Sequence, residues 1–354
     1  MPELALSVLD LVPVRVGQTS VDAVASSVSL AERADALGYR RYWLAEHHNM
    51  LSVASTNPPV LLGVLAGRTR SIRLGSGGVM LPNHAPFVIA EQFAALEAAA
   101  PGRIDLGIGR APGSDPVITA LLRSTGHTSD VDAFPNNVRD IEALLGADGA
   151  GLRLATGEEY TVRATPVAAG VPEIWLLGSS DYSAELAGRL GLPYVFAHHF
   201  FGKGAEHALE LYRSRFTPSE HLDAPRVFLT ANAVAAETEE EAMRLAMPQL
   251  RQMALLRTGG TLPPMETVES VGTAPTTAQQ ARLIEETAQT WFVGEAGEVA
   301  GRIAAFAERF GIDEVMVSAI AGASVDDPID RTPARERTLE LLAAHLPQRV
   351  LAAA

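Results

Sequence analysis

The chain contains no cysteine among its 354 residues. This absence excludes disulfides, thiolate-bound metals, iron–sulfur clusters and a cysteine nucleophile. The sequence also has no cluster of basic residues, and its 28 Lys and Arg against 42 Asp and Glu give a formal charge of -14. An acidic chain without a basic patch is poorly suited to binding nucleic acid or an anionic membrane. We therefore predict neither of them as a partner.

Long apolar runs are also absent, and no uninterrupted one is long enough to span a bilayer. Residues 1–14 lack the basic start and the cleavage pattern of a signal peptide, and Asp10 and Pro13 interrupt their apolar run. We therefore expect a cytoplasmic protein. Hydrophobic residues make up 47% of the chain and charged residues 20%, which is enough apolar material for a large buried core.

Short β-type runs alternate with helical patterns along the chain. The helical patterns have apolar spacing near 3.6, and typical helix ends occur at Gly38 and at Asn57-Pro58. Regular alternation implies a parallel sheet, and eight units in a chain of this length favour a (β/α)8 TIM barrel with insertions. A doubly wound open sheet is the alternative, because periodicity does not prove closure. The eight predicted strands are LALSVL, RRYWLA, IRLGSGGVM, RIDLGIG, EIWLLG, PYVFA, RVFLTANAV and DEVMVSAI.

We predict a single domain over residues 1–354, with two segments that depart from the alternation. Residues from about 124 to 171 contain a helix around Val138–Leu145 and then a Gly-rich stretch, which predicts a hairpin excursion. Residues from about 258 to 290 look loop-like and mobile. Because long loops in compact domains are usually functional lids or disordered, we expect a lid there.

Polar residues follow the second predicted strand, and a parallel barrel forms its active site at such strand ends. Glu46, His47 and His48 are consecutive there. Neighbouring residues at a strand end point to opposite faces, and the spacing matches no zinc motif, so we predict no metal site. A single inward histidine that acts as acid, base or hydrogen-bond donor fits better. The alternative is that one imidazole caps a loop while the other packs.

Two further strand ends have unusual residues. The stretch Gly75–Gly78 in the third strand indicates either a bulge or a flat ligand lying against the backbone. Arg110 follows the fourth strand, and arginine offers a bidentate fork to a phosphate. The alternative for Arg110 is a surface ion pair with Asp115. The fifth strand ends in Gly178, Ser179 and Ser180 just before a helix, whose free N–H groups form a ready anion site.

With these residues in place, the chain resembles the bacterial luciferase-like flavin monooxygenases over nearly its full length. Within that family it is most similar to the single-chain, alkanal-monooxygenase-like members. The segments that carry the resemblance are GYRRYWLAEHHN, IRLGSGGVMLPNHAPFVIAEQF, GRIDLGIGRAPGSD, PEIWLLGSSDYSAELAGRLGLPYVFAHHF and WFVGEAGEVAGRI with GIDEVMV.

The resemblance implies a barrel that uses reduced FMN, supplied by a separate NAD(P)H-dependent flavin reductase. Reduced FMN and O₂ would form a peroxyflavin that oxygenates an aldehyde, a similar carbonyl or another small organic substrate. By position, His47 matches the histidine that acts as general acid/base. The implied cofactor-binding residues are Gly77 and Gly78, which match a non-proline cis peptide beneath the isoalloxazine ring, Arg110 at the phosphate, and Gly178, Ser179 and Ser180 in the phosphate-side loop.

The chain departs from the luciferases at several positions. Gly109 stands where they carry a reactive cysteine, and Gly178 stands where they have a glutamate, so phosphate binding would rest on Ser179 and backbone groups. The excursion at about 124–171 differs in length, which puts transfer of the substrate in doubt. By position alone, His199 is a candidate for the substrate pocket, together with His198 and Asn232.

Other functions remain open on the same fold. A deazaflavin-dependent oxidoreductase would need no O₂, and a non-catalytic flavin-binding protein would bind oxidised flavin without turnover. A metal-dependent hydrolase is disfavoured by the ligand spacing. We also predict a homodimer, because the helices at Asn57–Gly67 and Pro86–Ala100 are rich in Ala, Leu and Val, and relatives pair through the corresponding helices. The alternative is that these apolar residues only cover the barrel.

Overall fold

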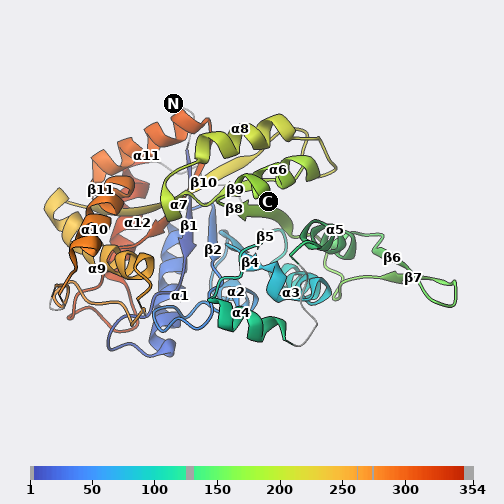
Figure 1. The fold of residues 1–354 in the computed structure, drawn as a ribbon, viewed down its shortest axis with the longest axis horizontal. Helices are drawn as coiled ribbons and strands as arrows, with labels where there is room; N and C mark the ends of the chain where they lie inside the picture. Colours follow the sequence, from blue (N-terminus) through green and yellow to red (C-terminus); the bar gives the residue numbers. More distant parts are fainter. Residues whose placement is uncertain (1–3, 125–130, 261, 273–274, 347–354) are drawn as a thin grey trace.

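Eight parallel strands close into a barrel (Figure 1). The computed structural model describes residues 4–124, 131–260, 262–272 and 275–346. The last barrel strand pairs with the first, and this pairing closes the sheet. The predicted barrel is therefore confirmed, and the open sheet is excluded. The barrel strands are β1 (Ala5–Asp10), β2 (Arg41–Leu44), β3 (Arg73–Ser76), β5 (Ile104–Gly109), β8 (Glu173–Gly178), β9 (Tyr194–Phe196), β10 (Val227–Ala236) and β12 (Glu314–Ala319).

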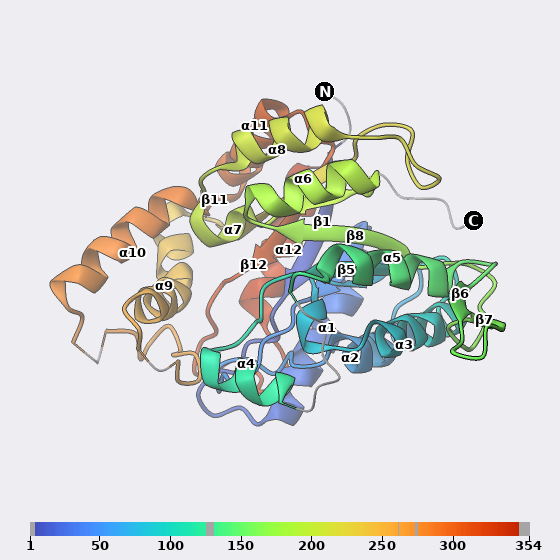
Figure 2. The same cartoon turned by 45° about the vertical axis from the view of Figure 1, so that its right-hand side comes forward.

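Helices form the outer layer around this barrel (Figure 2). The predicted helix ends are present: Asn57 accepts a hydrogen bond from the Val60 amide, and Gly38 has a φ of 79° just after the first helix. Glycine adopts that left-handed conformation without a Cβ clash. The helices are α1 (Ser20–Ala36), α2 (Pro58–Ala66), α3 (Pro86–Ala99), α4 (Pro116–Arg123), α5 (Phe134–Leu145), α6 (Asp181–Leu190), α7 (His198–Phe201), α8 (Ala205–Arg215), α9 (Glu239–Arg257), α10 (Ala278–Thr290), α11 (Ala296–Phe310) and α12 (Pro333–His345).

The third predicted strand is interrupted at its glycines. β3 ends at Ser76, and the peptide bond between Gly77 and Gly78 is cis, which is the geometry that the resemblance implies. A short strand β4 (Val79–Met80) follows and pairs with β5, and the 3-10 turn η1 (Leu81–Asn83) comes directly after it.

The excursion contains the predicted helix, α5, and the predicted hairpin. The antiparallel strands β6 (Ala150–Arg153) and β7 (Glu159–Val162) form an arm that projects from the barrel (Figure 1). Residues 125–130 of this excursion lie outside the described residues.

The expectation of a loop over residues 258–290 is wrong in its second half. Residues Ala278–Thr290 form α10, which begins with a capping box between Thr277 and Gln280 and packs against α9. The strand β11 (Phe292–Glu295) then extends the sheet beside β10 and was not predicted. The helix was missed because its polar, exposed surface gives a weak apolar pattern, whereas the capping residues mark its start.

Aromatic and charged side chains fill the amino-terminal half of the barrel. The rings of Trp43, Trp175 and Phe228 lie with centroids 4.9–5.8 Å apart. The Arg41 guanidinium lies 4.7 Å from the Trp175 ring centroid and 2.7 Å from a carboxylate oxygen of Glu314. Because these side chains fill the amino-terminal end of the barrel, the main pocket lies at the other end, beyond the carboxyl ends of the strands.

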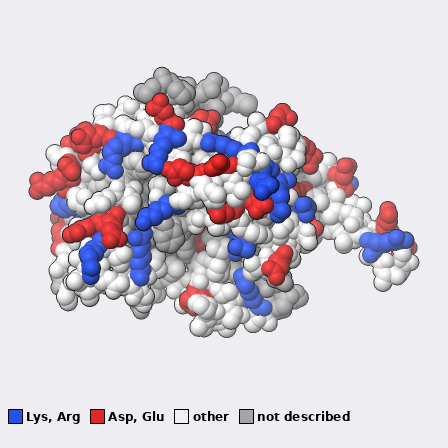
Figure 3. Space-filling view, turned by 45° about the horizontal axis from the view of Figure 1, so that its top comes forward, with Lys and Arg blue, Asp and Glu red and all other residues white. Residues whose placement is uncertain are grey.

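The charged side chains on the surface are mixed. On the face shown in Figure 3, Lys and Arg are interspersed with Asp and Glu. Within the described residues, no helix combines the length and apolar character needed to cross a membrane.

Candidate active site

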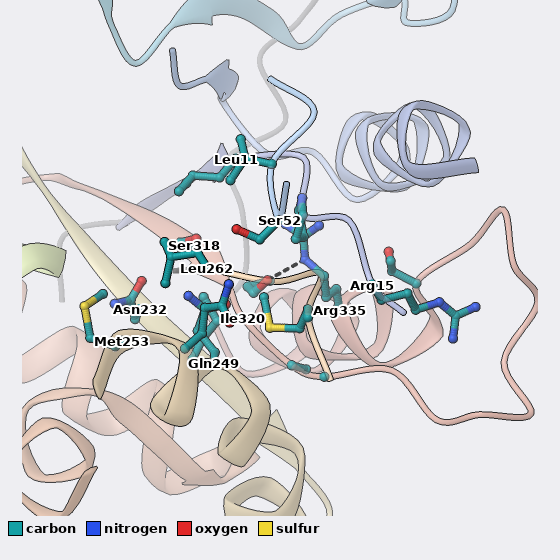
Figure 4. A pocket seen from close by; sticks show the side chains of 18 of the residues that line it. Leu11, Arg15, Ser52, Asn232, Gln249, Met253, Leu262, Ser318, Ile320 and Arg335 are labelled. Carbon is teal, nitrogen blue, oxygen red and sulfur yellow. Dashed lines mark hydrogen bonds between the residues drawn. The ribbon is translucent and has the colours of Figure 1, made fainter. Parts of the chain in front are cut away.

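The main pocket lies where β1, β10 and β12 end, and α9 covers one side of it (Figure 4). Most of its wall is apolar. The described residues that line it include two arginines and two histidines, but no aspartate or glutamate. A ligand here would therefore meet apolar groups, neutral polar groups and cations. Representative lining residues are Leu11, His47, Met50, Ser52, His199, Asn232, Gln249, Met253, Leu262, Ser318, Ile320, Arg15 and Arg335.

Glu46 is the buried centre of a hydrogen-bond network beside this pocket. Its Oε1 lies 2.8 Å from Nε2 of His48 and 2.8 Å from Nε2 of His84, and its Oε2 accepts a hydrogen bond from the Met80 amide. Burial raises the pKa of the Glu46 carboxyl, but the hydrogen bonds from His48 and His84 outweigh this effect and lower the pKa to about 2. The carboxylate is therefore charged near neutral pH. Glu46 and His48 are thus both occupied by hydrogen bonds between loops.

His47 belongs to the pocket wall. Its backbone amide donates to the carbonyl oxygen of Ser55, which fixes the chain next to the ring. Burial lowers the pKa of the His47 imidazole, Glu46 opposes that shift, and His48 reinforces it. The ring is thus neutral near pH 7, and its Nδ1 is a buried polar atom without a hydrogen-bond partner among the described residues. Such an atom indicates that the site is completed by something the chain does not supply.

His199 lines the same pocket from the first turn of α7. Its Nδ1 lies 2.5 Å from the hydroxyl oxygen of Thr230, and its carbonyl oxygen accepts a hydrogen bond of 3.1 Å from the Asn232 amide group. Burial lowers the pKa of the His199 imidazole to about 3, and the charges of His47 and His198 act in the same direction. The structure therefore brings together two neutral imidazoles that the sequence had placed on separate strands.

Arg110 and the turn after β8 also lie together. β5 and β8 are neighbours, and the Arg110 guanidinium sits 3.9 Å from the ring centroid of Tyr182 in the first turn of α6. Ser179 and Ser180 are exposed, and the side chain of the N-cap residue Ser180 makes no capping hydrogen bond to α6. Free amides, hydroxyls and a guanidinium at one place suit a phosphate.

The alternative partner for Arg110 has another role. Asp115 accepts hydrogen bonds from the amides of Val117 and Ile118 and so caps α4. Among the ion pairs of the described residues, none joins Arg110 to Asp115.

The glycines at this end of the barrel are explained by close packing within the protein. A Cβ at Gly77 would lie 2.7 Å from Leu9, and one at Gly78 would lie 2.7 Å from Leu177. A Cβ at Gly178 would collide with the Ser183 hydroxyl, so a glutamate could not replace this glycine without rearrangement. Close packing within the protein therefore accounts for these glycines, whether or not a flat ligand lies against them.

Sequence reasoning missed two arginines of the pocket wall. Arg335 donates to a carboxylate oxygen of Asp10 at 2.8 Å and to the Ala319 carbonyl at 2.5 Å. Arg15 donates to three carbonyl oxygens within Ser324–Pro328. Arg15 stands between apolar residues in VPVRVG, and this is the sequence signal that could have identified it as buried.

The donor set suits a flavin better than a metal. Within the described part of the chain, no group of three or more His, Asp or Glu side chains is placed to hold a metal ion. A flavin mononucleotide needs an anion site for its phosphate and a largely apolar pocket with a few polar groups for its ring. The cluster of Arg110, Ser179 and Ser180 fits the first, and the unpartnered Nδ1 of His47 in the pocket wall fits the second.

A family model described as luciferase-like monooxygenase matches residues 5–314. The chain belongs to the luciferase-like monooxygenase family. It is a flavin-dependent monooxygenase, in agreement with the fold and with the donor set of the site.

Curated relatives are similar over most of the chain. A luciferase-like monooxygenase of Escherichia coli (strain K12) is 46% identical over 264 residues, which cover 74% of this chain and 76% of the relative. An N-acetyl-S-alkylcysteine monooxygenase of Bacillus subtilis (strain 168) is 40% identical over 240 residues, covering 68% and 70%.

Solved structures share the whole fold. Apo-MsnO8 superposes with a TM-score of 0.84 at 30% identity and covers 98% of both chains. At 20% identity, the oxygenating constituent of 3,6-diketocamphane monooxygenase from Pseudomonas putida, in complex with FMN, superposes with a TM-score of 0.71 and covers 98% of this chain and 100% of its own. An F420-dependent secondary alcohol dehydrogenase superposes with a TM-score of 0.63 at 14% identity, covering 96% and 99%. The last two likenesses concern the fold alone.

Proposed function

We propose that the chain is the oxygenating component of a two-component system that uses reduced FMN and O₂ to oxygenate a small organic substrate. The observation that carries this proposal is the position of His47, a neutral imidazole in the wall of an apolar pocket. Among the described residues, its Nδ1 has no hydrogen-bond partner and no carboxylate lines the pocket. A separate NAD(P)H-dependent flavin reductase would regenerate the reduced FMN. Cytoplasmic location is part of the proposal.

Residues of this chain would divide the work between binding and chemistry. Arg110, Ser179 and Ser180 would hold the phosphate, with Gly77 and Gly78 on the ring side of the site. When bound, reduced FMN supplies the electrons with which O₂ is activated. The neutral His47 imidazole can take up a proton, and because burial lowers the pKa of this ring, it returns the proton readily. The apolar wall excludes water, which protects oxygen-activating chemistry from wasteful side reactions.

Two substrate classes are worth testing first. The family resemblance favours an aldehyde or a similar carbonyl compound. The relative from Bacillus subtilis acts, by its name, on N-acetyl-S-alkylcysteine, and its 40% identity with this chain favours a thioether as the second class. The pocket wall suits either class, since it combines apolar side chains with amides and hydroxyls.

Oxygen incorporation tests the proposal directly. Purified protein, chemically reduced FMN and ¹⁸O₂ would be mixed with octanal or with N-acetyl-S-benzylcysteine, and the products analysed by mass spectrometry. We expect one labelled oxygen atom per product molecule. The His47→Ala variant should lose turnover while it retains most of its affinity for FMN. Equal loss of both would remove the catalytic role of His47.

The deazaflavin alternative makes the opposite prediction. Reduced F420 would bind more tightly than reduced FMN, and turnover would proceed without O₂. Tight binding of oxidised FMN with no turnover on any substrate would instead support a non-catalytic flavin-binding protein.

We also propose a homodimer formed through α2 and α3. These helices pack against each other and expose apolar side chains to solvent, with Val60 and Val64 one turn apart on α2 and with Phe87 and Val88 at the start of α3. An exposed apolar patch of this kind is typical of an interface between protein subunits.

A further inference from the structure

His199 is held from two sides by the same strand. β10 directs both Thr230 and Asn232 toward His199, since residues two positions apart on a strand lie on the same face. The Thr230 hydroxyl oxygen lies 2.5 Å from the imidazole Nδ1, and the Asn232 side-chain amide donates a hydrogen bond of 3.1 Å to the His199 carbonyl oxygen. The backbone and the ring of His199 are therefore both fixed, although α7 is only four residues long.

The Thr230 hydroxyl favours one tautomer of the ring. The Thr230 hydroxyl donates to the Phe196 carbonyl oxygen at 3.4 Å, and the hydroxyl oxygen itself accepts a hydrogen bond from the His199 backbone amide at 3.4 Å. With its hydrogen used in this way, the hydroxyl oxygen is an acceptor for Nδ1–H of the imidazole. A neutral imidazole that carries its proton on Nδ1 has an unprotonated Nε2.

The pocket leaves that Nε2 available. Within the described residues, the imidazole makes no hydrogen bond through Nε2, and this atom is not among the buried polar atoms without a partner. The low pKa of His199 agrees with a neutral ring. Because no aspartate or glutamate is found among the described residues that line the pocket, none of them offers a carboxylate to stabilise an imidazolium.

We infer that His199 is a substrate-binding residue whose Nε2 accepts a hydrogen bond from an O–H or N–H group of the substrate. The pocket wall narrows the substrate class further. The described lining residues include Arg15 and Arg335 but no acidic residue, so a neutral donor such as a hydroxyl, a hydrated carbonyl or an amide fits, whereas an ammonium group does not. The apolar wall formed by Leu11, Met253 and Leu262 takes an aliphatic or thioether segment. The inference rests on the proposed function only for the reaction that the bound substrate undergoes. The hydrogen bond to His199 does not depend on that reaction.

The tautomer can be observed without any turnover. In a long-range ¹H–¹⁵N correlation spectrum of ¹⁵N-histidine-labelled protein, the His199 ring should show a protonated Nδ1 and an unprotonated Nε2 near pH 7. The signal is assigned by its loss in His199→Phe. In Thr230→Val the tautomer should shift toward Nε2–H, and Thr230→Ser should restore it. A protonated Nε2 in the wild-type protein would overturn the inference.

Ligand binding gives an independent readout. Octanamide and methyl octanoate have similar apolar chains, but only the amide has N–H donors, and calorimetry measures their affinities for the flavin-free protein. We expect the wild-type protein to prefer octanamide by roughly five- to tenfold, the ratio that one neutral hydrogen bond provides. His199→Phe should abolish this preference. His198→Phe is the matched control, because His198 packs against Phe306 and does not line the pocket.

The outcomes separate the two proposals. A preference that persists in His199→Phe, or a wild-type protein that binds neither probe or both equally, would overturn the inference. Since neither measurement uses flavin or O₂, a failure of oxygen incorporation with the tautomer and the amide preference intact would overturn only the proposed function.

Discussion

Nε2 of His84 lies 2.8 Å from Oε1 of Glu46, and this contact joins the turn after β4 to the end of β2 across 38 positions of the chain. The same oxygen binds His48, so one buried carboxylate fixes the loops on both sides of the cis peptide between Gly77 and Gly78. Glu46 is not among the described residues that line the main pocket. We therefore expect it to act as a positioning residue, through the neighbouring His47.

Replacing Glu46 with alanine should destabilise the fold by about 2–4 kcal/mol, because it leaves two imidazoles and the Met80 amide without their partner. Urea unfolding measures the change in the free energy of unfolding. The matched control is Glu32→Ala, since Glu32 forms an exposed ion pair with Arg68. The control should change stability by less than about 0.5 kcal/mol. An equally small change for Glu46→Ala would contradict the structural role of the network.

The stability conferred by Glu46 should depend on acid pH. Its pKa is lowered from 4.5 to about 2 in the folded protein, so its contribution is complete above the unfolded pKa and is lost as pH falls from about 4.5 through about 2. We expect the difference in unfolding free energy between the wild-type protein and Glu46→Gln to be largest above pH 5 and to shrink by up to about 3 kcal/mol toward pH 2. Denaturant unfolding at several pH values measures it. A difference that stays constant over this range would show that the carboxyl has an ordinary pKa.

Arg110→Ala should weaken FMN binding by roughly ten- to a hundredfold, the ratio expected when a charged hydrogen bond is lost. Quenching of flavin fluorescence measures the dissociation constant. Arg110→Lys should recover only part of the affinity, because lysine keeps the charge but loses the planar fork over Tyr182. Arg153→Ala on the projecting hairpin is the control, and it should bind FMN normally. Unchanged affinity in Arg110→Ala would remove this residue from the phosphate site.

The proposed dimer can be tested at α2. Light scattering at micromolar concentration should give twice the chain mass of 37.5 kDa for the wild-type protein. Val64→Glu should reduce it to the monomer mass, because a carboxylate in an apolar interface loses its hydration without a partner. Val167→Glu, at a more exposed valine outside α2 and α3, should stay dimeric. A monomeric wild-type protein would refute the proposal.

Much of the barrel could be predicted because its signals are local. The eight barrel strands, the cap at Asn57 and the helix end at Gly38 each depend on a few neighbouring residues. β11 and α10 were missed for the opposite reason. β11 is a short strand that pairs with the carboxyl-terminal residues of β10, and α10 is too exposed to show a strong apolar period. The lid function expected of residues 258–290 stays a prediction, and residues 261 and 273–274 lie outside the described part of the chain.

In the site, too, local features could be predicted from the sequence and long-range contacts could not. Local sequence placed His47, Arg110 and the turn at Gly178 at strand ends, and barrel closure makes those ends converge. Sequence could not show that Glu46 binds His84, or that Thr230 holds His199, because these contacts join residues 38 and 31 positions apart. Nor could it show whether the glycines accommodate a ligand or the protein itself, since the neighbours of a missing Cβ are known only once the strands are packed.

By itself, the sequence determined the alternating pattern, the strand ends and the residue types available there, because each follows from backbone preferences and apolar spacing over a few residues. Only the tertiary structure decided how the histidines divide their roles. His48 and His84 share one buried carboxylate, and His47 and His199 line the apolar pocket. The physical reason is that hydrogen-bond partners and burial depend on distances between strands, which local sequence does not encode.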